Sequence, residues 1–242
     1  MNTIIRNRFG ERIAYSFTPG AEQDSNLVLM GHGVTSDKDR PWSEALAQGL
    51  AQRGIASLRI AFSGNGESEG VFTDSTISKE VLDLRAVTDA FPDRRIGYVG
   101  HSMGGAVGAR AVASDDRLRY FVSLAGMVHT QDFVAQIFGK LKTGELMLDK
   151  PGRVLGEAFL QDMREIDSVQ SDALDIDVPW LIVHGSADDV VPLHHATDMH
   201  QAAAGRSELV VLPDVDHSFT GAGMQAMTVV VLPWLEAVCR AT

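Results

Sequence analysis

Short apolar segments alternate with longer amphipathic segments along most of the chain. Six near-continuous apolar segments, most of them bounded by Gly, Asp or Pro, predict strands at residues 27–30, 56–60, 96–99, 120–124, 180–183 and 209–212. Such runs are typical of parallel strands that are buried on both faces of a sheet. Residues 2–6 and 11–18 alternate more strictly and predict an antiparallel edge hairpin that turns at residues 7–10.

Helical periodicity occupies the intervals between these segments. It predicts helices at residues 42–52, 78–91, 103–112, 195–204 and 223–238. Alternating strands and helices indicate a doubly wound α/β sheet of about eight strands, mostly parallel and with right-handed crossovers. A chain of 242 residues can form one α/β domain of this size, so residues 1–242 are expected to be a single domain.

One long segment interrupts the alternation. About fifty residues separate the strand that ends near Gly126 from the strand that begins near Trp180, and a simple crossover needs far fewer. Helical patterns at residues 133–141 and 153–166 predict that residues 129–170 form a small helical cap over the sheet. The alternative is an elaborated crossover that is remote from any functional site.

The charge and the cysteine content narrow the classes of partner and compartment. The net charge of −11 disfavours binding to nucleic acid and to anionic membranes. The longest apolar run, residues 227–232, is too short to span a bilayer and is followed by Pro233. The single cysteine, Cys239, excludes an internal disulfide, and no apolar segment follows Arg6 and Arg8 as in a secretory signal. These features favour a cytoplasmic protein.

A candidate nucleophile follows the strand at residues 96–99. Gly100-His101-Ser102-Met103-Gly104 lies at a predicted strand-to-helix turn, where a strained backbone would expose Ser102 and where small flanking residues are needed. The backbone N–H of Met103 would then point into the site from the first turn of the helix. The alternative for this segment is a glycine-rich turn with a capping serine.

A serine nucleophile requires a general base and a carboxylate that orients the base. Of eight histidines, His217 follows the last predicted strand and precedes the last helix, which is where the chain order Ser, acid, His requires the base. A solvated loop histidine is the alternative. Asp188 and Asp189 follow the penultimate strand, and Asp188 is the preferred partner of His217, with Asp189 as a surface or capping carboxylate.

The loop after residues 27–30 offers a second donor for an oxyanion. Val34 in the glycine-flanked turn Gly31-His32-Gly33-Val34-Thr35 is the predicted backbone donor beside Met103, and His32 is expected to hold the loop in shape. Residues 63–70 lack the Lys-Ser/Thr ending of a phosphate-binding loop and are expected to form a flexible loop near the pocket wall. His194, His195 and His200 lack a close carboxylate or thiolate in sequence, so no metal and no cofactor are predicted.

Taken together, these motifs resemble the α/β-hydrolase superfamily from about Leu27 onward, and within it the small bacterial carboxylesterases of the cinnamoyl and feruloyl esterase type. The residues that carry the resemblance are His32-Gly33-Val34-Thr35, Gly54-Ile55-Ala56-Ser57-Leu58-Arg59, Phe62-Ser63-Gly64-Asn65-Gly66-Glu67-Ser68-Glu69-Gly70, Gly100-His101-Ser102-Met103-Gly104-Gly105 and Asp216-His217-Ser218-Phe219. The resemblance implies that the helical insertion shapes the acyl pocket. The chain departs from the esterases at Ala61 and Asn65, where an Asp and a His are common, and its insertion is shorter.

The sequence thus predicts a serine hydrolase that cleaves small-molecule carboxylic esters with small or aromatic acyl groups. Phe133, Phe138, Leu141 and Met147 are candidate pocket residues, although residues at helical spacing are more often simple core. A thioesterase, a lactonase or a small peptidase would use the same triad, and a binding protein of this fold would need none of it. A homodimer through an edge strand or the cap surface is left open.

Overall fold

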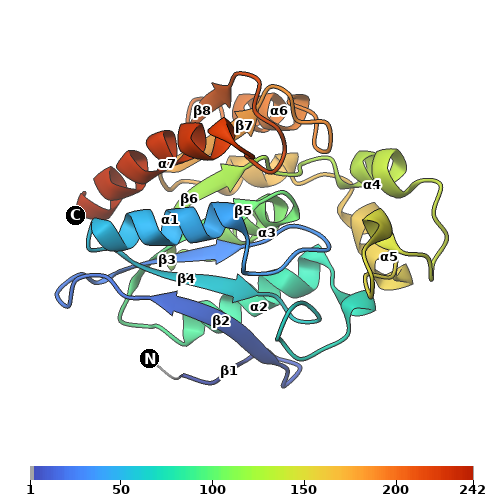
Figure 1. Ribbon diagram of the computed structural model, residues 1–242, viewed down its shortest axis with the longest axis horizontal. Coiled ribbons are helices and arrows are strands. Elements are labelled where there is room, and N and C mark those ends of the chain that lie inside the picture. The colour runs from blue at the N-terminus through green and yellow to red at the C-terminus, as the bar shows by residue number, and fades with distance from the viewer. Residues whose placement is uncertain (1–2, 242) are drawn as a thin grey trace.

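The computed structural model describes residues 3–241 and arranges eight strands in a sheet with the order β1-β2-β4-β3-β5-β6-β7-β8 (Figure 1). The parallel strands are β3 (Asn26–Gly31), β4 (Ala56–Ala61), β5 (Arg95–His101), β6 (Leu118–Leu124), β7 (Trp180–Gly185) and β8 (Ser207–Leu212). The predicted edge hairpin consists of β1 (Ile5–Arg6) and β2 (Arg12–Thr18), which pairs antiparallel with β4. Asn2, the first residue of the predicted hairpin, lies outside the described residues.

Helices cover both faces of the sheet because side chains alternate between the two faces of each strand. Along β3, Val28 and Met30 pack with α1 (Pro41–Gln52) and α7 (Ala222–Arg240), in front of the sheet in Figure 1. Leu27 and Leu29 belong to the opposite core, together with residues of α2 (Ile77–Asp89), α3 (Met103–Val112) and α6 (His194–Ala202). This two-sided burial explains the continuous apolar strands of the sequence.

The helical insertion lies beyond the carboxyl ends of the parallel strands, on the right in Figure 1. Its helices, α4 (Thr130–Phe138) and α5 (Glu157–Ile166), contact each other, and short 3-10 turns occur at Phe72–Asp74 (η1), Met147–Asp149 (η2) and Gln170–Asp175 (η3). The predicted helix at residues 153–166 begins late because Val154 forms a β-bridge with Leu146 and Gly156 is the N-cap of α5. Antiparallel bridging of His129 with Ser168 closes the base of the insertion.

The last helix differs from the sequence-based expectation about membranes. By length and apolar composition α7 is able to span a bilayer, although the apolar run before Pro233 was expected to be too short. In this structure Met227, Val231 and Leu235 of α7 are buried in the core cluster that includes α1. The apolar face of α7 therefore contributes to the packing of the sheet.

Candidate active site

Ser102 occupies a sharp turn between β5 and α3. Its backbone has φ 57° and ψ −121°, a conformation that is rare for a residue with a side chain and that costs about 1–3 kcal/mol. The structure also shows why the motif contains glycines. A Cβ on Gly100 would lie 2.1 Å from the carbonyl oxygen of Gly104, and a Cβ on Gly104 would lie 2.6 Å from the carbonyl oxygen of Gly31. Only glycine fits at these two positions while β5, α3 and the end of β3 stay this close.

His217 and Asp188 come together from two loops at the same end of the sheet. Nδ1 of His217, between β8 and α7, lies 2.8 Å from Oδ2 of Asp188, which follows β7. Asp189 is exposed, so the structure pairs the first of the two adjacent aspartates with the histidine. A proton on Nδ1 that is donated to Asp188 leaves Nε2 of His217 free to accept another proton. Among the hydrogen bonds of residues 3–241, none joins Ser102 Oγ to the His217 ring; such bonds often tighten only when substrate binds.

A second imidazole, which the sequence analysis did not select, contacts the same carboxylate. Nε2 of His184, a fully buried residue of β7, lies 3.2 Å from Oδ2 of Asp188 and 2.8 Å from the carbonyl oxygen of Val191. Oδ1 of Asp188 accepts backbone N–H groups of Val190 and Val191 at 2.9 and 2.8 Å. Burial alone would raise the pKa of Asp188, but the hydrogen bonds from His184 and His217 hold it well below its usual range. Asp188 is therefore a fully ionised carboxylate at neutral pH.

His101, the residue before Ser102, also holds the candidate base. Its Nε2 donates a hydrogen bond of 2.8 Å to the backbone oxygen of His217, and the two rings lie 4.8 Å apart. Burial and the neighbouring His217 lower the pKa of His101 to about 3, so this imidazole is neutral at physiological pH. The sequence signal for this contact is only the position of His101 inside the serine motif, because His217 lies 116 residues away.

The loop after β3 packs directly against Ser102. A Cβ on Gly33 would lie 2.7 Å from Ser102 Cβ. Nδ1 of the buried His32 donates to the Gly33 carbonyl oxygen at 2.9 Å, and its Nε2 accepts the N–H of Phe62 at 3.2 Å. Burial lowers the pKa of His32 to about 4, in agreement with this neutral bridging role. Within residues 3–241, neither predicted oxyanion donor, Val34 N–H or Met103 N–H, is engaged by another protein group.

Val34 and Met103 both line a narrow pocket, which holds about 250 Å³ of empty space when the adjoining open solvent is included. It is lined by Val34, Thr35, Asn65, Phe72, Ser75, Glu80, Met103, Met147, Val154, Gly156 and Phe159. Four of these residues come from the insertion 129–170, which is therefore not remote from the candidate site. Of the pocket residues named from the sequence, only Met147 lines it. Phe133 and Phe138 are buried core residues and Leu141 packs against the same core, which is the commoner fate of residues at helical spacing.

One residue that lines this pocket, Glu80, has a side chain that is normally charged and exposed. It is 1% exposed, its Oε1 accepts the Ser75 hydroxyl at 3.3 Å, and its Oε2 has no hydrogen-bond partner among the described residues. Burial, reinforced by the neighbouring Asp83, raises the pKa of Glu80 well above its ordinary value. Asn65 at the same wall belongs to the loop 63–70, which internal backbone hydrogen bonds hold in place although it was expected to be flexible.

A carboxylate that was not predicted from the sequence, that of Asp198, lies beside His129 and His194. His129, His194 and Asp198 place one ligand atom each within 4.8 Å of one another, and His129 Nε2 lies 3.0 Å from Asp198 Oδ2. Asp198 lies one helical turn after His194, but His129 comes from the start of the insertion, so the linear sequence did not reveal the cluster. Two imidazoles and a carboxylate form a donor set suited to a transition metal. The cluster shares no residue with the group of Ser102, His217 and Asp188. Cys239 is buried against Tyr120 and is not part of either group.

Several known proteins are similar to this chain. It is 25% identical over 205 residues to the uncharacterized protein YfhR of Salmonella typhimurium, covering 80% of this chain and 65% of the relative. It is 27% identical over 177 residues to the human mitochondrial palmitoyl-protein thioesterase ABHD10, covering 67% of this chain and 55% of that protein. The chain thus spans less than two thirds of the length of these relatives.

Solved structures repeat the fold over nearly the whole chain. Est1E from Butyrivibrio proteoclasticus with ferulic acid bound superposes with a TM-score of 0.84 at 22% identity, covering 97% of this chain and 98% of Est1E. The esterase Pf2001 from Pyrococcus furiosus gives a TM-score of 0.74 at 19% identity, covering 100% and 92% of the two chains. At these identities the likeness concerns the fold. The alpha/beta hydrolase fold family matches residues 26–175, more than half of the sequence, and this chain belongs to that family.

Proposed function

We propose that this protein is a serine hydrolase that cleaves small carboxylic esters. The observation that carries the proposal is the pairing of His217 Nδ1 with the buried Asp188 carboxylate at 2.8 Å, close to a serine held at φ 57° between β5 and α3. A strained serine at such a turn, together with an oriented imidazole, is the arrangement that activates a hydroxyl for acyl transfer. Family membership and the esterases among the structural relatives support hydrolase chemistry.

The reaction has two steps. His217 Nε2 takes the proton of Ser102 Oγ as this oxygen bonds to the ester carbonyl carbon, and the N–H groups of Val34 and Met103 stabilise the oxyanion. His217 then gives the proton to the departing alkoxide oxygen as the carbon–oxygen bond breaks, which releases the alcohol and leaves an acyl-serine. Water, deprotonated by His217, attacks the acyl-serine. His217 returns this proton to Ser102 Oγ as the bond between Oγ and the acyl carbon breaks, which releases the acid and regenerates Ser102. Asp188 stabilises the imidazolium in both steps.

The shape of the pocket limits the acyl group. Met147, Val154 and Phe159 of the insertion line the pocket together with Val34 and Met103, so the acyl chain would be held between the insertion and the carboxyl ends of the strands. A pocket this narrow favours a short or flat acyl group over a long chain. This agrees with the resemblance to esterases whose substrates carry aromatic acyl groups, although the substrate of this protein need not be the same.

The direct test is hydrolysis of p-nitrophenyl esters from acetate to palmitate and of methyl ferulate. Ser102→Ala is expected to lower kcat by about 10⁶-fold, as loss of the nucleophile does in a well-studied serine protease. Asp188→Asn is expected to lower kcat by about 10⁴-fold, whereas the matched control Asp189→Asn, at the adjacent exposed carboxylate, retains activity.

Two results would contradict this proposal. Activity that survives in Ser102→Ala would exclude Ser102 as the nucleophile. Wild-type protein that cleaves neither esters nor thioesters and does not react with a fluorophosphonate probe would be a binding protein of this fold.

A further inference from the structure

Two basic side chains of this acidic protein, Lys150 and Arg153, contact residues that line the candidate pocket, and the charge of Arg40 acts on Lys150. Arg40 ends the loop after β3 and is the N-cap of α1, and Lys150 and Arg153 lie in the insertion between η2 and α5. All three are partly buried. The chain has a net charge of −11, so a local group of cations is not a consequence of its composition.

Direct contacts place two of these cations at the pocket. Lys150 Nζ lies 3.4 Å from the carbonyl oxygen of Thr35, the residue after the candidate oxyanion donor Val34. The Arg153 guanidinium lies 4.9 Å from the centre of the Phe72 ring and 3.5 Å from the Gly64 carbonyl oxygen. Thr35 and Phe72 line the pocket, as do Met147 and Val154, which lie in the sequence on either side of the segment that carries Lys150 and Arg153. Lys150 and Arg153 therefore lie beside residues that line the pocket.

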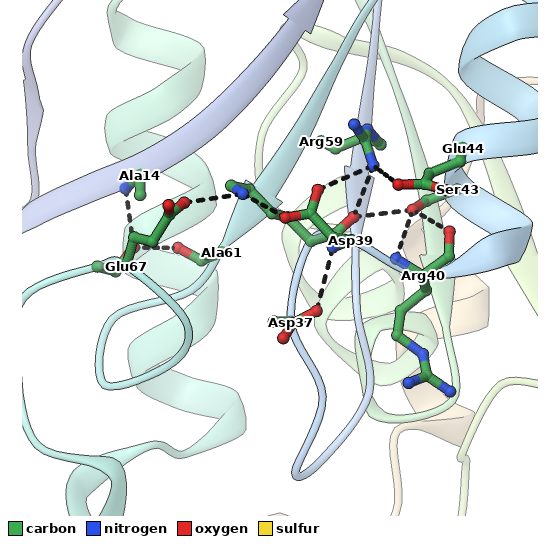
Figure 2. Close-up of polar contacts among 11 residues, drawn as sticks. Ala14, Asp37, Asp39, Arg40, Ser43, Glu44, Arg59, Ala61 and Glu67 are labelled. Carbon is green, nitrogen blue, oxygen red and sulfur yellow. Dashed lines mark hydrogen bonds and ion pairs between the residues drawn. The ribbon is translucent and has the colours of Figure 1, made fainter.

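Three of the acidic side chains nearby are engaged with other cations. Asp39 pairs with Lys38 and Arg59, Glu67 pairs with Lys38, and Glu44 pairs with Arg59. Figure 2 shows this network and shows the Arg40 side chain pointing away from it, with no dashed line at its guanidinium. Among the ion pairs of residues 3–241, none includes Arg40, Lys150 or Arg153.

The cations repel one another in the absence of an anion. Burial lowers the pKa of Lys150, and the positive charges of Arg40 and Arg153 lower it further, with only Asp37 acting in the opposite direction. The carboxylate of Asp37 already accepts the backbone N–H of Asp39 at 3.1 Å. Like charges held together in a partly dehydrated place are unfavourable unless an opposite charge completes the group. Because Lys150 and Arg153 contact residues of the pocket lining, a ligand in the pocket is in a position to supply this charge.

We propose that Arg40, Lys150 and Arg153 bind an anionic group of the substrate, a carboxylate or a phosphate, while its acyl carbonyl lies at Ser102. Guanidinium and ammonium groups are the usual protein donors to these two anions. The inference rests on the proposed function and specifies its substrate class: esters or thioesters that carry a negative charge. The neutral protein groups of the inner pocket then receive the uncharged part of the acyl group.

Matched substrate pairs that differ in charge test this inference. Mono-p-nitrophenyl succinate and its methyl ester place the charge on the acyl group, and 4-acetoxybenzoate and its methyl ester place a carboxylate on the alcohol. Butyryl-coenzyme A and S-butyryl-N-acetylcysteamine test phosphate on the leaving group. The anionic member of at least one pair is expected to have a kcat/KM about 10- to 100-fold above its neutral partner, as charge-assisted hydrogen bonds would provide.

Variants connect the preference to the named cations. In Arg40→Gln/Lys150→Gln the anionic-to-neutral ratio of kcat/KM is expected to fall at least tenfold and to depend less on salt. Lys142→Gln, which changes an exposed lysine of the same insertion, is the matched control and should keep the wild-type ratio. A neutral preference in all three pairs, or a preference that persists in the double variant, would overturn the inference while Ser102-dependent cleavage of p-nitrophenyl acetate leaves the proposed function standing.

Calorimetry with Ser102→Ala provides a readout that does not require turnover. Mono-p-nitrophenyl succinate should bind more tightly than its methyl ester, and the Arg40→Gln/Lys150→Gln changes should remove the difference. Equal affinities would reject the anion site whether or not the wild-type protein cleaves esters.

Discussion

The imidazole of His184 lies 3.2 Å from the carboxylate of Asp188, and neither side chain is exposed to solvent. Asp188 is thereby held by two imidazoles and two backbone N–H groups. Four donors around one buried carboxylate stabilise its charge and also fix the direction in which Oδ2 faces His217. His184 is thus a positioning residue for the proposed triad.

Replacement of His184 by leucine should therefore affect the pH dependence as well as the rate. The lost hydrogen bond is expected to raise the pKa of Asp188, to lower kcat about tenfold and to move the acidic limb of the kcat–pH profile to higher pH. His200→Leu, at a histidine that bonds Ser207 away from the triad, is the control. An unchanged pH profile in His184→Leu would show that His184 only fills space.

The same carboxylate predicts how stability depends on pH. Since the pKa of Asp188 is lower in the folded chain than its ordinary value of 3.8, its ionised form favours folding. This contribution is present above about pH 4 and is lost as the pH falls from there toward the folded-state pKa. Urea unfolding at a series of pH values should show a weaker loss of stability in acid for Asp188→Asn than for the wild type.

Glu80 predicts the opposite pH trend. Its pKa is raised in the folded chain, so the protonated form favours folding, and stability should fall as the pH rises above about 4.5. Glu80→Gln keeps the shape of a neutral carboxyl group and is expected to flatten this part of the stability curve and to stabilise the protein at pH 7. Glu165→Gln, at an exposed position of α5, should leave the curve unchanged. A Glu80→Gln variant that is less stable at pH 7 would contradict a neutral Glu80.

His101 should be needed to hold the base rather than to transfer protons. With a pKa of about 3 it stays neutral across the working range, so His101→Phe removes a hydrogen bond to the His217 backbone without removing a titrating group. The expected result is a lower kcat with little change in the pKa values of the pH–rate profile. A shifted profile would instead indicate that His101 takes part in proton transfer.

Gly33 provides a steric test of the oxyanion loop. A methyl group there would lie 2.7 Å from Ser102 Cβ, so Gly33→Ala is expected to displace the loop and to lower kcat/KM by at least 100-fold. Gly144→Ala is the control, because its added Cβ meets nothing within 4 Å and only its positive φ of 96° is strained. The control should lose about 1 kcal/mol of stability and keep its activity.

Local features of the chain were sufficient to predict much of this arrangement. Buried parallel strands leave continuous apolar runs, and the strand-to-helix turn at Ser102 leaves its glycines in the sequence, because both constraints act between residues that are close along the chain. The order of strands also limits where a base and an acid can lie, which is why His217 and Asp188 could be named and their contact then observed. The fold class and the edge hairpin were predicted correctly for the same reason.

Contacts between distant segments required the tertiary structure. Packing brings a carboxylate to His184 and a backbone carbonyl group to His101. No local pattern marks His184, and His101 is marked only by its position in the serine motif. The pocket residues of the insertion depend on how α4 and α5 turn toward the sheet, so Phe159 lines the pocket whereas Phe133 and Phe138 are core. Likewise Arg40 and Lys150 are 110 positions apart by their numbering, and only folding brings their charges close enough to act on each other. Periodicity records burial along each element, whereas electrostatic and hydrogen-bond partners depend on distances through space that the linear order of residues does not contain.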